Sequence, residues 1–153
     1  KIMAKKTGVY GMLGVHSVDV ENDGKEISRG MLDYIYEHKT SALIEASMMA
    51  GAILGGANEE QTAQIEKAAS AIGLAFQIQD DILDVTSTSQ ELGKPVHSDE
   101  KNNKVTYVTL FGVEKASEQV QKLSEQAEAV LEGLSSKNKF LTALVMEMAS
   151  RRK

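Results

Sequence analysis

The chain contains no cysteine and no tryptophan, and only one of its 153 residues is proline. Without cysteine it can form neither disulfides nor thiolate metal sites, and it has no thiol nucleophile. No apolar run approaches the roughly eighteen residues that a membrane-spanning helix needs, so we expect no membrane insertion. The sequence also opens without a signal-peptide pattern, and the predicted location is therefore cytoplasmic.

The overall composition is that of a globular protein with a single hydrophobic core. Hydrophobic residues make up 42% of the chain and charged residues 25%. The formal net charge of -5 argues against general nucleic-acid binding, which requires a basic face. Because the sequence begins Lys-Ile-Met, we expect the 153 residues to be a piece of a longer protein.

The hydrophobic pattern predicts helices along nearly the whole chain. Alternation of β-branched and polar residues, which would indicate strands, is missing. Ser28 and Asn58 are expected to cap two of the helices. We therefore predict one all-α domain over residues 1–153. The expected helices cover residues 3–23, 28–54, 58–85, 104–111, 114–131 and 137–149, with a loop over residues 86–103.

The stretch FQIQDDILD places three carboxylates in an apolar segment. Asp80, Asp81 and Asp84 are the only charged residues from residue 68 to residue 85. At about 100° per residue, Asp84 lies roughly 40° from Asp80 around the helix, Gln77 roughly 60° and Asp81 roughly 100°. The four polar side chains therefore share one face of a helix that is otherwise apolar nearly all round.

Such a helix is expected to be buried, and buried carboxylates are costly unless a cation compensates them. Salt bridges to lysine or arginine are one possibility, and a divalent metal ion is the other. Three acids near a helix C-terminus repel one another and oppose the helix dipole, so a purely structural role has little to favour it. Mg²⁺ takes oxygen ligands and is commonly held by carboxylates together with substrate phosphates. A bundle with a merely acidic surface does not fit the apolar surroundings.

Lysines near this acidic face suggest a phosphate-bearing ligand. The loop TSTSQELGKPVHSDEKNNK carries Lys94 and Lys104, ten and twenty residues after Asp84. A lysine is a compact point charge that suits a phosphate oxygen, although each could also be a solvated loop charge. Lys39 precedes an apolar stretch in which Glu45 is the only charge, and the acidic face offers this lysine a partner.

These motifs resemble those of the trans-isoprenyl diphosphate synthases, which include farnesyl and geranylgeranyl diphosphate synthases. FQIQDDILD followed by ELGKP is similar to the second aspartate-rich motif of that family, with wording closest to the bacterial farnesyl-type enzymes. YIYEHKTSALIEASMMAGAILGGA, residues 34–57, is similar to its lysine-threonine helix. GMLGVHSVDVENDGK, residues 11–25, is similar to its glycine-rich helix. The resemblance implies the C-terminal half of an isoprenoid-synthase-type helical bundle.

The resemblance also implies roles for individual residues in the transfer of an allylic group to isopentenyl diphosphate. The ligands of Mg²⁺ would be Asp80, Asp81 and Asp84. The contacts to the allylic diphosphate would be Lys39, Lys94 and Lys104. The catalytic residues near the carbon that loses diphosphate would be Lys39, Thr40 and Gln77.

Two departures from the family pattern limit what can be carried over. Val15-His16 replaces a glycine-glutamine pair, so His16 receives no role, and Asp19 is only a candidate for supporting the site. The family uses two DDxxD motifs and an upstream region that binds isopentenyl diphosphate, and this sequence contains one such motif. We therefore expect an inactive C-terminal piece of an enzyme that is a homodimer at full length. The alternative is a noncatalytic half-length subunit that binds a full-length prenyl synthase.

Overall fold

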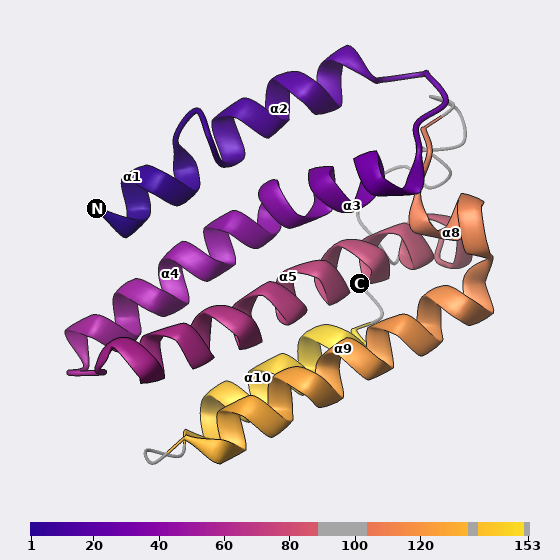
Figure 1. Ribbon diagram of the computed structural model, residues 1–153. Helices are drawn as coiled ribbons and strands as arrows, with labels where there is room; N and C mark the ends of the chain where they lie inside the picture. Colours follow the sequence, from indigo (N-terminus) through magenta and orange to yellow (C-terminus); the bar gives the residue numbers. More distant parts are fainter. Residues whose placement is uncertain (89–103, 135–137, 152–153) are drawn as a thin grey trace.

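The computed structural model describes residues 1–88, 104–134 and 138–151, and within these ranges the chain forms helices and no strands (Figure 1). The all-α prediction is confirmed. The predicted loop over residues 86–103 lies outside the described residues from residue 89 onward. The described helices are α1 (Ile2–Thr7), α2 (Met12–Glu21), α3 (Arg29–His38), α4 (Thr40–Leu54), α5 (Glu59–Thr86), α8 (Tyr107–Phe111), α9 (Val113–Gly133) and α10 (Lys139–Ser150).

Helix α5 is the central element of the bundle. It packs most extensively against α4 on one side and α9 on the other, and Figure 1 shows these three as neighbouring long rods. Helices α1, α2 and α3 contact α4, while α10 packs against α9 and α5. None of the helices in the described part of the chain combines the length and apolar character needed to cross a membrane.

Two hydrophobic clusters lie along α5. The first surrounds its C-terminal half and draws side chains from α2, α3, α8 and α9. The second surrounds its N-terminal half and draws side chains from α9 and α10. The buried members of the first cluster are Val15, Leu32, Ile35, Tyr36, Ala75, Ile78, Ile82, Tyr107, Ala116, Val120 and Leu123. Those of the second are Ile65, Ala68, Ile72, Ala127, Leu131 and Val145.

Both predicted helix caps are present. The Asn58 side chain accepts a hydrogen bond from the Gln61 backbone N–H at 2.8 Å, and the Gln61 side chain accepts one from the Asn58 N–H at 3.0 Å. This reciprocal pair satisfies two donors that the first turn of α5 would leave without partners. Ser28 Oγ likewise accepts from the Met31 N–H at 3.2 Å, at the start of α3.

Two of the predicted helices are wrong in extent, because each is divided into two. The helix expected over residues 3–23 is interrupted between α1 and α2, at a turn that contains Gly8 and Gly11. The Gly11 N–H donates to the Gly8 carbonyl at 2.9 Å, which closes that turn. Glycine is a poor helix former, and the apolar pattern alone did not register its effect.

The helix expected over residues 28–54 is interrupted at Lys39, between α3 and α4. Lys39 has a ψ angle of -104°, outside the helical range. The Ser41 hydroxyl donates to the Tyr36 carbonyl oxygen at 2.8 Å and so satisfies an acceptor at the end of α3. This interruption has no glycine or proline to mark it in the sequence.

Close to the interruption, α5 approaches the start of α4 at Gly73. A Cβ atom added at Gly73 would lie 2.5 Å from the Cα, Cβ and Oγ atoms of Ser41, far inside van der Waals contact. Only glycine therefore allows this approach, which presses the start of α4 against the middle of α5.

Gly73→Ala should lower the free energy of unfolding by roughly 1 to 3 kcal/mol, because the added methyl group overpacks the contact with Ser41. Urea unfolding followed by circular dichroism would measure the change. The matched control is Gly51→Ala in α4, where an added Cβ meets nothing within 4 Å. That change should raise stability by about 0.5 to 1 kcal/mol, as alanine does in an open helix position. Equal effects of the two substitutions would contradict the close approach.

A partly buried charge cluster joins α1 to α4 and α5. Lys6 Nζ donates to the carboxylate of Glu45, which is nearly buried in α4, and lies 2.6 Å from Glu66 Oε1 in α5. Burial alone would lower the pKa of Lys6, but hydrogen bonds and attraction to Glu45 and Glu66 outweigh it and raise that pKa. Glu45 is thus compensated by a lysine that the sequence pattern did not identify as its partner.

Candidate active site

A small polar recess of about 40 Å³ lies where α2, α3 and α5 meet the segment before α8. Its lining includes Asp19, Tyr36, Lys39, Gln77 and Lys104. The fold therefore brings together Lys39, Gln77 and Lys104, three predicted site residues that are far apart in the chain.

Asp19 lies between the two lysines of the recess. Lys39 Nζ is 2.6 Å from Asp19 Oδ2, and Lys104 Nζ is 3.9 Å from Asp19 Oδ1. The expectation that Lys39 faces the aspartates of α5 is corrected here, because its ion pair is with Asp19 of α2. The Asp19 side chain is largely buried, so this carboxylate holds two ammonium groups near each other in a partly desolvated position.

Thr40 and Gln77 are in direct contact. Gln77 Nε2 donates to Thr40 Oγ1 at 2.8 Å, which joins the first residue of α4 to the middle of α5. The interruption at Lys39 places Thr40 in this position, because it turns the start of α4 toward α5. The two side chains that the resemblance placed near the reacting carbon thus form one polar pair beside the lysines.

Asp81 is buried and has structural partners. It is 8% exposed, and its Oδ2 accepts hydrogen bonds from the Tyr36 hydroxyl at 2.5 Å and from the Tyr107 N–H at 3.0 Å. These contacts tie α5 to α3 and to the start of α8. The assignment of Asp81 as a ligand of Mg²⁺ stays a prediction, and in this structure its Oδ2 is hydrogen-bonded to α3 and to the start of α8.

Tyr36→Phe should lower the free energy of unfolding by about 1 to 3 kcal/mol, because it removes a hydrogen-bond donor from a buried carboxylate. Thermal or urea unfolding would measure the loss. Combining it with Asp81→Asn should give less than the sum of the two single losses, since both remove the same contact. The control is Tyr34→Phe in the same helix, where the ring is exposed and the change should stay within about 0.5 kcal/mol. Strict additivity would contradict the role given to Asp81.

The other two aspartates differ from Asp81 and from each other. Asp84 is only 2% exposed, whereas the Asp80 side chain is 40% exposed and its Oδ1 lies 3.1 Å from Arg151 Nη2. Among the described residues, no three histidine, aspartate or glutamate side chains are grouped as a metal site. Mg²⁺ commonly takes one or two protein carboxylates and completes its shell with water and phosphate. The carboxylates of Asp80 and Asp84 match that donor chemistry, none of the three aspartates lines the recess of Asp19 and the lysines, and their assignment as metal ligands stays a prediction.

Sequence reasoning missed or undervalued three participants. Asp19 received only a supporting role, although it pairs with Lys39 and Lys104, two of the three predicted diphosphate contacts. Tyr36 carried one available signal, since a tyrosine on a buried helix face needs a partner for its hydroxyl. Arg151 carried no signal, because it lies 71 residues from Asp80 in the sequence. Lys94, the third predicted diphosphate contact, lies outside the described residues.

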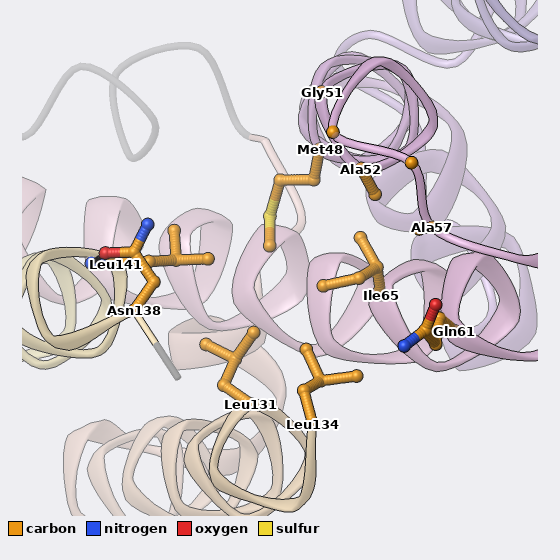
Figure 2. Close-up of a pocket in the computed structure, with 12 residues that line it drawn as sticks. Met48, Gly51, Ala52, Ala57, Gln61, Ile65, Leu131, Leu134, Asn138 and Leu141 are labelled. Atoms are coloured by element: carbon orange, nitrogen blue, oxygen red, sulfur yellow. Dashed lines mark hydrogen bonds between the residues drawn. The ribbon is translucent and has the colours of Figure 1, made fainter. Parts of the chain in front are cut away.

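A second, larger cavity of about 500 Å³ lies elsewhere in the bundle, among α4, α5, α9 and α10. Figure 2 shows Met48, Ile65, Leu131 and Leu141 around it, with no charged side chain among the residues that line it. Ile65 is twelve residues from Gln77, or about 18 Å along the axis of α5. A cavity without charged or nucleophilic groups cannot neutralise an anion, so it is not a candidate for the chemistry.

Comparisons with known proteins place this arrangement in context. Residues 12–144 match the polyprenyl synthetase family. The chain is 42% identical over 118 residues to farnesyl diphosphate synthase from Geobacillus stearothermophilus, covering 77% of this chain and 40% of that one. It is 45% identical over 130 residues to chloroplastic geranylgeranyl pyrophosphate synthase from Catharanthus roseus, covering 84% of this chain and 36% of that one.

The fold is also similar to that of a solved structure from an isoprenoid enzyme. The geranyltransferase from Helicobacter pylori complexed with magnesium and isoprenyl diphosphate matches with a TM-score of 0.79 and 29% identity. The match covers 96% of this chain and 48% of the other. The chain thus spans about 40% of the length of the two curated relatives and about half of this structure.

Proposed function

The chain belongs to the polyprenyl synthetase family, and from this premise we propose that it is the C-terminal half of a trans-prenyltransferase. The reaction is the condensation of isopentenyl diphosphate with an allylic diphosphate, which forms a farnesyl-type or geranylgeranyl-type product. The observation that carries the proposal is the meeting of Lys39, Gln77 and Lys104 at one recess, with Thr40 bonded to Gln77.

The lysines bind the diphosphate of the allylic substrate. In the described structure Lys39 and Lys104 share the single carboxylate of Asp19. A diphosphate carries more negative charge and more oxygen acceptors than one carboxylate, so it can take over both ammonium groups while Asp19 still limits their spread. Lys94, outside the described residues, is the third contact in this proposal.

Asp80, Asp81 and Asp84 supply carboxylate oxygens for Mg²⁺, and the hydrogen bonds of Asp81 also hold α5 to α3 and α8. When bound, Mg²⁺ neutralises the negative charge that grows on the leaving diphosphate. The lysines add to the same effect, because fixed cations near a developing anion lower the barrier to its departure. The similar geranyltransferase from Helicobacter pylori is complexed with magnesium and isoprenyl diphosphate, which supports this choice of ion.

Thr40 and Gln77 face the carbon from which diphosphate departs. Their side-chain oxygens stabilise positive charge on that carbon, and their mutual hydrogen bond fixes their direction. The apolar residues of the first hydrophobic cluster, which surround this part of α5, keep water from the cation until the double bond of isopentenyl diphosphate attacks it. The new carbon–carbon bond leaves a cation on the isopentenyl unit, and loss of a proton from that unit forms the double bond of the product.

The residues described so far would form one side of the active site, and the opposite side is proposed to come from sequence that precedes this chain in the full enzyme. The 153 residues contain one DDxxD motif, and isopentenyl diphosphate would bind mainly to the other half. A noncatalytic subunit would have no need of the lysines and aspartates assembled here, so their presence favours the enzyme. The cytoplasmic location and the homodimer of the full enzyme stay predictions.

A direct assay tests the proposal. The complete reading frame that encodes this chain should be expressed and incubated with labelled isopentenyl diphosphate, Mg²⁺ and geranyl or dimethylallyl diphosphate. We expect transfer of label into a longer allylic diphosphate, with loss of transfer when Mg²⁺ is chelated. Binding of both substrates without any condensation would reject the prenyltransferase and favour the noncatalytic subunit.

A further inference from the structure

Arg151, after the end of α10, lies against α5 beside the proposed metal ligand Asp80. Its Nη2 donates to Asp80 Oδ1 at 3.1 Å and to the Phe76 carbonyl oxygen at 3.5 Å. Its guanidinium carbon lies 3.9 Å from the centroid of the Phe76 ring, in a cation–π contact. Its own carbonyl oxygen accepts a hydrogen bond from Gln79 Nε2 at 3.1 Å. Both the side chain and the main chain of Arg151 are therefore fixed to α5.

These contacts fix the guanidinium of Arg151 in one place, but they do not satisfy all of its hydrogen-bond donors. The Nε of Arg151 is buried without a hydrogen-bond partner. A buried donor without an acceptor costs free energy, and this cost offsets part of what the ion pair and the stacking contribute. The Asp80 side chain is also 40% exposed, which weakens the ion pair by solvent screening. Arg151 is thus held in a defined place by a contact weak enough to be displaced.

We propose that Arg151, as a cation bound to Asp80, competes with the divalent metal ion for that carboxylate. The inference rests on the proposed function, in which Asp80 binds Mg²⁺. A guanidinium bonded to Asp80 Oδ1 offsets negative charge that would otherwise attract a metal ion, so each cation would weaken the binding of the other. Metal binding at Asp80 would therefore loosen the attachment of Arg151 to α5.

The competition is reciprocal. If Arg151 weakens metal binding by some factor, then bound metal weakens the attachment of Arg151 by the same factor. Removing the arginine should accordingly tighten metal binding. A substitution that weakens the attachment of Arg151 but keeps its charge should also tighten metal binding. Such a result would show competition at Asp80, because the net charge of the protein is unchanged.

The test uses Mn²⁺ as the probe and the 153-residue chain as the protein. Free Mn²⁺ is counted by electron paramagnetic resonance, and circular dichroism verifies that each variant keeps its helices. Arg151→Gln should tighten Mn²⁺ binding roughly 5- to 10-fold, within the usual range of coupling between two ligands. Phe76→Leu, which removes the stacking ring and leaves every charge, should tighten it by a smaller factor. If Arg151→Gln fails to fold, Phe76→Leu carries the test.

The matched control is Arg29→Gln. Arg29 also pairs with an aspartate, Asp33, and also lies over a ring, that of Phe111 at 5.1 Å, but it is on α3. Its loss removes the same charge and should leave the affinity for Mn²⁺ unchanged. Equal affinity in wild type, Arg151→Gln and Phe76→Leu would overturn the competition while leaving the proposed metal site intact. No binding of Mn²⁺ by any of them would overturn both.

Discussion

Asp80→Ala in the full-length enzyme should lower kcat by roughly two to three orders of magnitude, the usual cost of removing one group that stabilises charge in the transition state. The loss should fall mainly on kcat, because the negative charge on the departing diphosphate is greatest in the transition state and not in the bound substrate. Steady-state kinetics at saturating Mg²⁺ would measure it. Stability should change by no more than about 1 kcal/mol, since Asp80 is partly exposed and its ion pair with Arg151 is screened.

Asp33→Ala is the control for this substitution. Asp33 is as exposed as Asp80, with 39% of its side chain accessible, and it also pairs with an arginine. Its ion pair is with Arg29 of the same helix, and it is not one of the proposed site residues, so its loss should leave kcat unchanged. Near-normal turnover of Asp80→Ala in saturating Mg²⁺ would contradict the role of Asp80 as a metal ligand and, with it, the proposed metal site.

The 153-residue chain alone should give no detectable condensation of isopentenyl and allylic diphosphates, the largest loss that we expect. Catalysis of this kind depends on holding two substrates in register as well as on neutralising charge, and misplacement alone costs orders of magnitude. The lysines and aspartates of this chain can bind the allylic diphosphate, but they cannot orient isopentenyl diphosphate, whose binding residues are proposed to lie mainly in the other half of the enzyme. Product analysis on the purified chain, at protein concentrations well above those used for the full enzyme, would test this expectation.

Weak binding should survive in the same chain. Isothermal titration calorimetry with a bisphosphonate should detect binding that depends on Mg²⁺ and is lost in Lys39→Ala, since Lys39 lines the recess. Lys67→Ala, which removes an exposed lysine from α5, should leave the binding intact. Robust prenyl transfer by the isolated chain would show that it is not half of a site, whatever its affinity for the bisphosphonate.

The fold was largely predictable, because long apolar periodicity and side-chain caps are local signals. The hydrogen bonds of Ser28 and Asn58 begin α3 and α5 where their residue types predicted. The division at Lys39 was not predictable in the same way. The interruption is accompanied by contacts of Ser41 with Tyr36, five residues earlier, and with Gly73 of α5, which is far away in the sequence. An apolar pattern continues through such a point without a change.

The site was predictable as a set of residues but not as a set of contacts. Spacing placed Gln77 and the three aspartates on one face of α5, yet their partners come from four different segments. Thr40, Tyr36, Tyr107 and Arg151 decide which polar group is buried, bonded or exposed. A carboxylate at about 100° from Asp80 can point to solvent or to a tyrosine, and only the packing of α3 and α8 selects the tyrosine for Asp81.

The close approach of Gly73 to Ser41 has a consequence for the entropy of ligand binding. Fixing the backbone of one residue costs about 1 to 2 kcal/mol of conformational entropy at 25 °C. Lys39 lies in the interruption and Thr40 begins α4, next to the contact of Ser41 with α5, so the φ and ψ angles of both residues are set when the protein folds. The main chain of Lys39 is therefore already ordered before a diphosphate binds. The entropy cost of ordering it belongs to folding and does not reduce the binding affinity.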